Sequence, residues 1–247
     1  MAKLHPQLLT RLAQNDAFDK LKVKAKSEDR ENMLRVLISA SPKDLFVLRR
    51  SSFTNIGALK GTTADILSVG RKLVHVMRSA VGNNAQGISA VQLGILAPIF
   101  CVRRYDTESS NPRTLLDIWC VAEDGVEGFG PDVGQIEGCL SVFIPYEETT
   151  AHRIETDPQF ASAITIWRPQ YARVRGYRLI VDLDRPGDDD TAIHAAKIED
   201  FSSNAGVTYQ GIEARCVLHE FDHLHGKLHP DKLPRHYRER MITSGKY

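Results

Sequence analysis

Residues 210–226, QGIEARCVLHEFDHLHG, decide the fold of this chain because a metal-binding motif lies within a helical pattern there. The pattern predicts a helix that ends at Gly226, a residue type common at helix C-termini. Inside it, His219, Glu220 and His223 form an HExxH motif. At about 100° per residue the two histidines lie one turn apart on one face, and the glutamate projects within the same arc. Two imidazoles so placed can bind one metal ion while the carboxylate reaches a water molecule on that ion.

The composition is that of an ordinary globular protein. The chain has 247 residues, of which 42% are hydrophobic and 26% are charged, so it can build a core without disulfides. Its formal net charge of +1 removes the bulk-charge argument for DNA or an anionic membrane as a partner. Neither a signal peptide nor an apolar run long enough for a membrane span is visible, and the 4 cysteines lie far apart. We therefore expect a cytoplasmic protein with free thiols.

The rest of the chain alternates between helix and strand patterns. A second helix is predicted over about 63–81, where apolar side chains recur on one face. RPGDDD at 185–190 is predicted to be a turn or loop. The outline is an α+β fold whose strands are mostly antiparallel. Short β-rich segments lie at 98–104, 115–122 and 177–183.

Two regions are expected along the chain. Residues 1–44 are predicted to be an N-terminal helical extension, with helical patterns at 6–14 and 30–39. This region contains no catalytic motif, so we interpret it as an extension that packs against the domain or docks to a partner. Residues 45–247 contain the motifs and form the predicted catalytic domain.

A catalytic metal site normally has three protein ligands, and the sequence offers two candidates for the third. His229 completes the pattern H-E-x-x-H-x-x-G-x-x-H, which resembles that of the metzincin zinc endopeptidases. Only 18 residues follow it, which leaves little room for the Met-containing turn of that family. Upstream, Cys139 stands in the segment Glu137–Ser141, EGCLS. A thiolate is a good ligand for zinc or ferrous iron, although a lone cysteine is more often an inert buried residue.

EGCLS followed by HExDH resembles the peptide deformylases, whose second and third motifs these are. The family's first motif has a counterpart in AQGISAVQ at 85–92, and the three motifs occur in the family order. The sequence HLHGKL, which starts at His223, also resembles the family's continuation. The resemblance covers about residues 45–235. It implies a peptide-deformylase-like fold in which mostly antiparallel β-sheets pack around a central helix that bears HExxH.

The resemblance also implies a metal centre. Cys139, His219 and His223 would hold one divalent ion, Fe²⁺ in the cell, with Zn²⁺, Ni²⁺ or Co²⁺ able to replace it. Glu220 would act as general base and then as general acid. Asp222, also inside the motif, is either a partner that orients one imidazole or a solvated charge.

The implied reaction removes the formyl group from the N-terminal methionine of a nascent peptide, or from a related N-formyl amine, and releases formate. The side-chain amide of Gln92 and the backbone N–H of Leu140 would stabilise the oxyanion. The implied partners are N-formylated peptides, with ribosome-associated nascent chains among them. The residues expected to line the substrate site are Gln86, Gly87, Gly138, Arg215 and Cys216.

Gly87 would let a substrate backbone approach as an added strand, although a tight turn explains a glycine equally well. Arg215 and Cys216 lie about one turn before His219 and would face the substrate. Their alternatives are a solvated helix face for the arginine and plain core packing for the cysteine.

The chain departs from the family in its first motif, which has Ala85, Gln86 and Ser89 at altered positions, and at Leu218, where the family usually has glutamine. Gln86 would sit at the family's methionine pocket, where a buried amide costs about 1–3 kcal/mol unless a partner satisfies it. We therefore hypothesise that the substrate is not a standard N-formyl-methionyl chain, or that affinity for it is reduced.

Cys139 and His219 lie 80 positions apart, a larger separation than in compact family members. Insertions are expected at about 145–165 and 185–208, as a lid, a docking surface or inert loops. Two other functions stay open: a zinc endopeptidase of metzincin type, and a non-catalytic deformylase-like binding protein.

Overall fold

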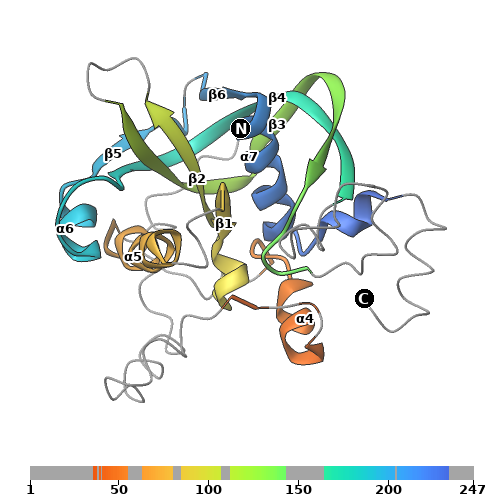
Figure 1. Ribbon diagram of the computed structural model, residues 1–247, viewed down its shortest axis with the longest axis horizontal. Coiled ribbons are helices and arrows are strands. Elements are labelled where there is room, and N and C mark those ends of the chain that lie inside the picture. Colours follow the sequence, from red (N-terminus) through yellow and green to blue (C-terminus); the bar gives the residue numbers. More distant parts are fainter. Residues whose placement is uncertain are drawn as a thin grey trace, which may run out of the picture.

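The computed structural model describes residues 36–37, 39, 41–54, 63–79, 85–106, 112–142, 164–203 and 205–233 (Figure 1). Two helices, α5 and α7, lie against a curled β-sheet, and shorter helices lie at its margins. The helices are α4 (Pro42–Leu48), α5 (Thr63–Arg78), α6 (Asp189–His194) and α7 (Gly211–Leu224), with 3-10 turns η2 (Ala90–Leu93) and η5 (His229–Lys232). The strands are β1 (Gly87–Ser89), β2 (Ile99–Asp106), β3 (Arg113–Glu137), β4 (Ile164–Asp182), β5 (Lys197–Asp200) and β6 (Val207–Gln210).

The strands form one six-stranded sheet in which every pairing is antiparallel. Its order is β1-β2-β3-β4-β5, and β6 also pairs with β4. The long strands β3 and β4 make a ribbon whose register shifts twice, and this ribbon curls past α7 (Figure 1). Such irregularities bend strands and increase their twist. The prediction of an α+β fold with antiparallel strands is confirmed.

Alternation along the strands gives the sheet two buried faces. On one face, Ile118 of β3 lies in the same apolar cluster as Leu73 of α5. Trp119, the next residue of β3, turns to the other face and packs with Val217 of α7. Helix α7 contacts β1, β2, β3, β4 and β6, which places the HExxH motif beside the sheet.

Predicted helix ends agree with the observed ones to within a few residues. The helix expected at 63–81 is α5, which ends at Arg78. The helix expected at 210–226 is α7, and Gly226 follows its C-cap with a left-handed φ of 70°. The turn expected at 185–190 is shorter than predicted, because Asp188 accepts the Thr191 N–H and starts α6 at Asp189.

Much of the predicted N-terminal extension, residues 1–35, lies outside the described residues. The end of its second predicted helix is not helical: the N–H groups of Leu37 and Ser39 bind the carbonyls of Gln92 and Ser141. The insertion expected at 145–165 also lies outside them, apart from the first residues of β4.

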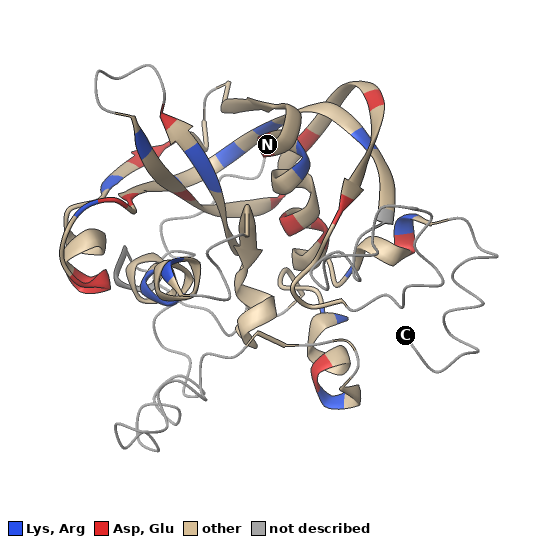
Figure 2. Cartoon of the chain, in the orientation of Figure 1, with Lys and Arg blue, Asp and Glu red and all other residues tan. Residues whose placement is uncertain are grey.

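The insertion expected at 185–208 contains α6 and β5. Helix α6 lies against α5, where Arg71 pairs with Asp190 and Arg78 pairs with Asp189 (Figure 2). This segment is therefore joined to the sheet and to α5. Within the described residues no helix is long and apolar enough to cross a membrane.

Candidate metal centre

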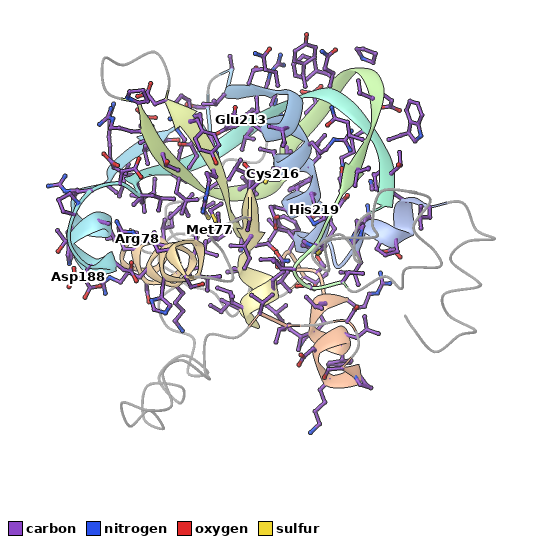
Figure 3. All side chains as sticks on the ribbon, viewed as in Figure 1. Met77, Arg78, Asp188, Glu213, Cys216 and His219 are labelled. Carbon is purple, nitrogen blue, oxygen red and sulfur yellow. The ribbon has the colours of Figure 1, made fainter. Side chains whose placement is uncertain are left out.

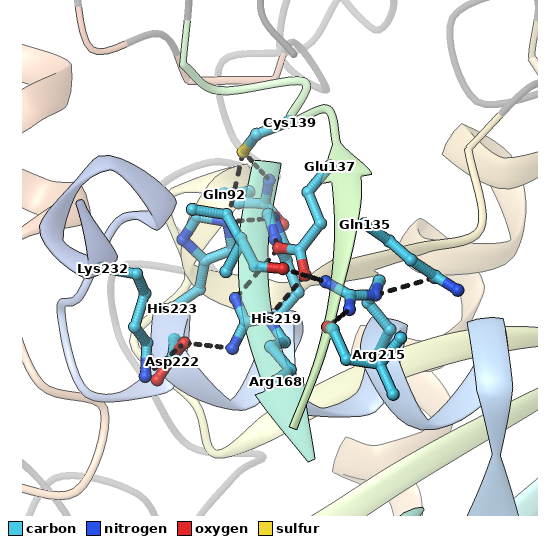
Figure 4. Close-up of polar contacts among 12 residues, drawn as sticks. Gln92, Gln135, Glu137, Cys139, Arg168, Arg215, His219, Asp222, His223 and Lys232 are labelled. Carbon is cyan, nitrogen blue, oxygen red and sulfur yellow. Dashed lines mark hydrogen bonds and ion pairs between the residues drawn. The ribbon is translucent and has the colours of Figure 1, made fainter. Parts of the chain in front are cut away.

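Three potential metal ligands from two distant parts of the chain meet at one end of α7 (Figure 4). The sulfur of Cys139, just beyond β3, lies 3.3 Å from Nε2 of His223. Nε2 of His223 lies 3.2 Å from Nε2 of His219, one turn earlier on the helix. The structure therefore brings together the thiol and the two imidazoles that the sequence suggested.

The spacing of these atoms suits a metal ion. A tetrahedral ion held at about 2.0–2.1 Å by nitrogen and about 2.3 Å by sulfur separates its ligand atoms by about 3.3–3.6 Å. The observed separations of 3.2 and 3.3 Å are close to that range. Both imidazoles are buried, and one sulfur with two nitrogens is a donor set that suits Zn²⁺ and Fe²⁺.

The two histidines have opposite electrostatic environments. Burial lowers the pKa of His223, and the charge of His219 lowers it further. Burial also acts to lower the pKa of His219, but hydrogen bonds with Cys139 and Glu137 outweigh it and raise that pKa well above its usual value. A metal ion that binds His219 has to displace the proton that this raised pKa favours.

Glu220 has the properties of a general base. Its side chain is buried, and among the described residues its Oε2 has no hydrogen-bond partner. Burial raises the pKa of Glu220 to about 7. A carboxylate with this pKa can take and return a proton near neutral pH.

The amide of Gln92 is oriented by its neighbours. Its Oε1 accepts the backbone N–H and the hydroxyl of Ser89 at 2.8 and 3.0 Å. Its Nε2 therefore points the other way, 3.1 Å from Ser141 Oγ and 3.8 Å from Cys139 Sγ. Leu140 directly follows the cysteine, and 37% of its surface is exposed. A donor amide thus lies at the candidate metal centre.

Gly87 has a packing reason to be a glycine. A Cβ atom there would lie 2.5 Å from Cys216 Sγ and 2.6 Å from the carbonyl oxygen of Cys101. The missing side chain therefore allows β1 to approach α7. Gln86, just before β1, is half-buried, and its carbonyl accepts the Arg103 N–H at 2.7 Å. At Gly138, by contrast, an added Cβ would meet nothing within 4 Å.

Cys216 precedes His219 along α7 (Figure 3). Its thiol is buried, and burial together with the charge of Glu220 raises its pKa well above the usual value. The thiol is therefore neutral near neutral pH and serves to pack β1 against α7.

Arg215 lies neither on a solvated face nor in an open pocket. Its guanidinium is buried and binds Glu137 Oε1 at 2.5 Å, Gln135 Oε1 at 3.0 Å and the Ile166 carbonyl at 3.0 Å. It also donates to the carbonyl of Val133. The side chain is thus bound to the β3–β4 ribbon.

Sequence reasoning assigned no role to Glu137 or Arg168. Glu137 Oε2 lies 3.1 Å from Nδ1 of His219, and hydrogen bonds from His219 and Arg168 outweigh burial and lower its pKa below the usual range. Arg168 donates to Glu137 at 2.7 Å and to Asp222 at 2.7 Å. Asp222 therefore contacts an arginine and Lys232, not an imidazole. The first residue of EGCLS was the available signal for Glu137, whereas no motif marked Arg168.

His229, the other candidate ligand, is also close to the site. Its ring is buried, and its centroid lies 5.7 Å from that of His219. Among the described residues, however, the ligand atoms that lie within 4.8 Å of one another belong to Cys139, His219 and His223. The arrangement favours the thiol as the third ligand.

Comparison with known proteins shows what the chain is similar to. No curated protein matches the chain in sequence. Among solved structures, a peptide deformylase from Plasmodium falciparum is 20% identical, with 85% of this chain and 91% of that chain covered and a TM-score of 0.43. A peptide deformylase from Legionella pneumophila is 17% identical, with 85% and 92% covered and a TM-score of 0.43. A probable peptide deformylase from synechococcus phage S-SSM7 is 18% identical, with 81% and 99% covered and a TM-score of 0.46.

The family model described as polypeptide deformylase matches residues 194–239, which include all of α7 and η5. The match thus contains both histidines of the candidate metal centre, with Cys139 lying outside it. Over this segment, the chain is similar to the polypeptide deformylase family.

Proposed function

We propose that this chain is a metal-dependent hydrolase that removes a formyl group from the amino terminus of a peptide, or from a related N-formyl amine. The similarity of residues 194–239 to the polypeptide deformylase family model supports a deformylase-type hydrolase. The observation that carries the proposal is the 3.3 Å separation of Cys139 Sγ and His223 Nε2, which lie 84 residues apart in sequence.

Cys139, His219 and His223 would hold the ion, with Fe²⁺ as the proposed native metal and Zn²⁺, Ni²⁺ or Co²⁺ as substitutes. When bound, such an ion lowers the pKa of a water molecule and polarises a carbonyl oxygen. The donor set and its spacing support this assignment.

The other residues of the site would handle protons and developing charge. Glu220 takes a proton from the attacking water and returns it to the departing amine, as its raised pKa allows. The oxygen of water becomes part of formate as the bond between the formyl carbon and nitrogen breaks. Gln92 Nε2 and the Leu140 N–H would donate to the oxyanion, and such donors each contribute about 3–4 kcal/mol in known cases.

The direct test is release of formate from a panel of N-formyl peptides and N-formyl amines, after anaerobic purification and metal analysis. We expect Glu220→Gln to keep the metal and to lose activity by about 10²- to 10⁴-fold, the usual size of a general-base contribution. Unchanged formate release by this variant would contradict the proposal. So would the absence of formate release by the wild-type chain from every substrate of the panel.

Mass spectrometry of the same reactions separates this function from the endopeptidase. A deformylase converts a formyl-peptide to the free amine and leaves internal peptide bonds intact. Cleavage of internal bonds in an N-acetylated control peptide would favour the endopeptidase instead.

A further inference from the structure

The carboxylate of Glu137 lies between two arginines from different elements (Figure 4). Its Oε1 accepts from Arg168 Nε at 2.7 Å and from Arg215 Nη1 at 2.5 Å. Its Oε2 accepts from Arg168 Nη2 at 3.1 Å and faces His219 Nδ1 at 3.1 Å. Arg168 therefore binds both oxygens, Arg215 binds Oε1, and His219 faces Oε2.

We propose that Arg215 and Arg168 together lock Glu137 in the orientation that keeps a proton on Nδ1 of His219, and so leaves Nε2 of that ring free for the metal. Arg215 is then a positioning residue, and it acts through Glu137. The inference rests on the proposed metal centre, and it adds the residues that set the tautomer of the ligand His219.

The chemistry of the carboxylate sets the tautomer. An ionised carboxylate accepts hydrogen bonds and donates none, so the ring nitrogen that faces it has to carry a hydrogen. A neutral imidazole has one such hydrogen, which leaves Nε2 with the lone pair that binds a metal. Partners of this kind orient histidine ligands in metal sites generally.

The contribution of Arg215 follows from its place in the fold. Arg168 is shared, because it also donates to Asp222 at 2.7 Å. Arg215 lies four residues before His219 on α7, so both side chains emerge from one face of the helix. Its bonds to the Val133 and Ile166 carbonyls fasten that face to the ribbon that carries Glu137.

This arrangement makes a specific prediction for Glu137→Gln. The amide oxygen should take the place of Oε1, where both arginines donate, which leaves the NH₂ group facing His219. Nδ1 then has to accept, so the hydrogen moves to Nε2 and competes with the metal. We expect zinc affinity to fall by about 10- to 100-fold, as found for comparable partners of metal-bound histidines.

The experiment measures zinc affinity by competition with a chromophoric chelator, and the Nδ1 proton of His219 by nitrogen-15 NMR. Arg215→Met should weaken zinc binding and reduce the Nδ1 proton signal, whereas Arg215→Lys, which keeps the positive charge, should restore a large part of both. Arg178→Met is the matched control, since it removes an arginine paired with Asp117 and Glu199 away from the site and should leave zinc affinity unchanged.

Thermal unfolding of each variant separates loss of the fold from loss of the site. If Arg215→Met does not fold, zinc affinity and the Nδ1 proton are compared between Arg215→Lys and the wild type. Wild-type zinc affinity and an intact Nδ1 proton in folded Glu137→Gln and Arg215→Met would overturn the inference. Failure of the wild-type chain itself to bind zinc would instead overturn the proposed function.

Discussion

Cys139 and His229 are the two residues between which the third metal ligand has to be chosen. The thiol groups with His219 and His223, whereas the ring of His229 stands beside that of His219. We expect Cys139→Ala to lose bound metal and His229→Ala to retain it, as measured by metal content after dialysis. The reverse result would favour the endopeptidase.

The pKa of Glu220 predicts the direction in which the reaction rate changes with pH. Burial raises its pKa to about 7 in the protein without an ion, and a bound dication would lower that value. Because the ionised form is the base, kcat/KM should fall as the pH drops through about 7 or somewhat below. A rate that stays flat from pH 5 to 8, at constant metal content, would argue against this role.

Gln86 bears on substrate choice. The residue is half-buried and lies just before β1, where the family resemblance expects the methionine pocket. If this position lines that pocket, Gln86→Leu should raise kcat/KM for formyl-Met-Ala-Ser by about 10-fold, since an unsatisfied amide costs about 1–3 kcal/mol. Formyl-Gly-Ala-Ser, which lacks the side chain, is the matched control and should respond little.

At the scale of elements, α7 is held at its C-terminal end as well as along its buried face. Gly226 has a φ of 70°, and a Cβ atom there would lie 2.3 Å from the carbonyl oxygen of Arg49. The Ser52 N–H also binds the carbonyl of Leu224 at 2.7 Å. The segment after α4 thus closes the end of the helix that carries both histidines.

We expect Gly226→Ala to lower the free energy of unfolding by about 2–4 kcal/mol, from left-handed backbone strain plus overpacking. Two other glycines separate these terms. Gly211 has a φ of 59° with nothing within 4 Å, so its alanine variant reports strain alone, and Gly138→Ala should report neither. Urea unfolding measures all three, and equal effects at Gly211 and Gly226 would remove the role of the Arg49 contact.

At the scale of the whole molecule, a buried polar network joins four strands of the sheet, including β6, the strand that leads into α7. The Tyr209 hydroxyl donates to Asp117 at 2.7 Å and accepts from Trp119 Nε1 at 2.8 Å. Arg104 and Arg178 also bind Asp117, whose side chain is fully buried. The strands β2, β3, β4 and β6 therefore share one charged centre.

Tyr209→Phe should lower the free energy of unfolding by about 1–3 kcal/mol, because it leaves the buried Trp119 indole N–H without its acceptor and removes one donor from the Asp117 carboxylate. Burial raises the pKa of Tyr209 well above 10, so the folded state keeps a proton that the unfolded state releases. Stability should thus fall as the pH rises above about 10 in the wild type, and less steeply in the variant. Parallel slopes from pH 9 to 11 would contradict this account.

The sequence by itself determined the features that depend on local spacing. The helix of residues 211–224, its end at Gly226 and the shared face of His219 and His223 follow from a period of about 3.6 residues per turn. The resemblance of EGCLS and HExDH to a known family then singled out Cys139 as their partner. The tertiary structure alone decided which distant groups meet, because pairing of β3 with β4 places Arg168 beside Glu137 across 31 residues of sequence. The tertiary structure also shows that Arg215, which was expected to contact substrate, instead links α7 to the β3–β4 ribbon. A buried charged side chain needs hydrogen-bond partners, and these partners are distant in sequence, so no local pattern predicts them.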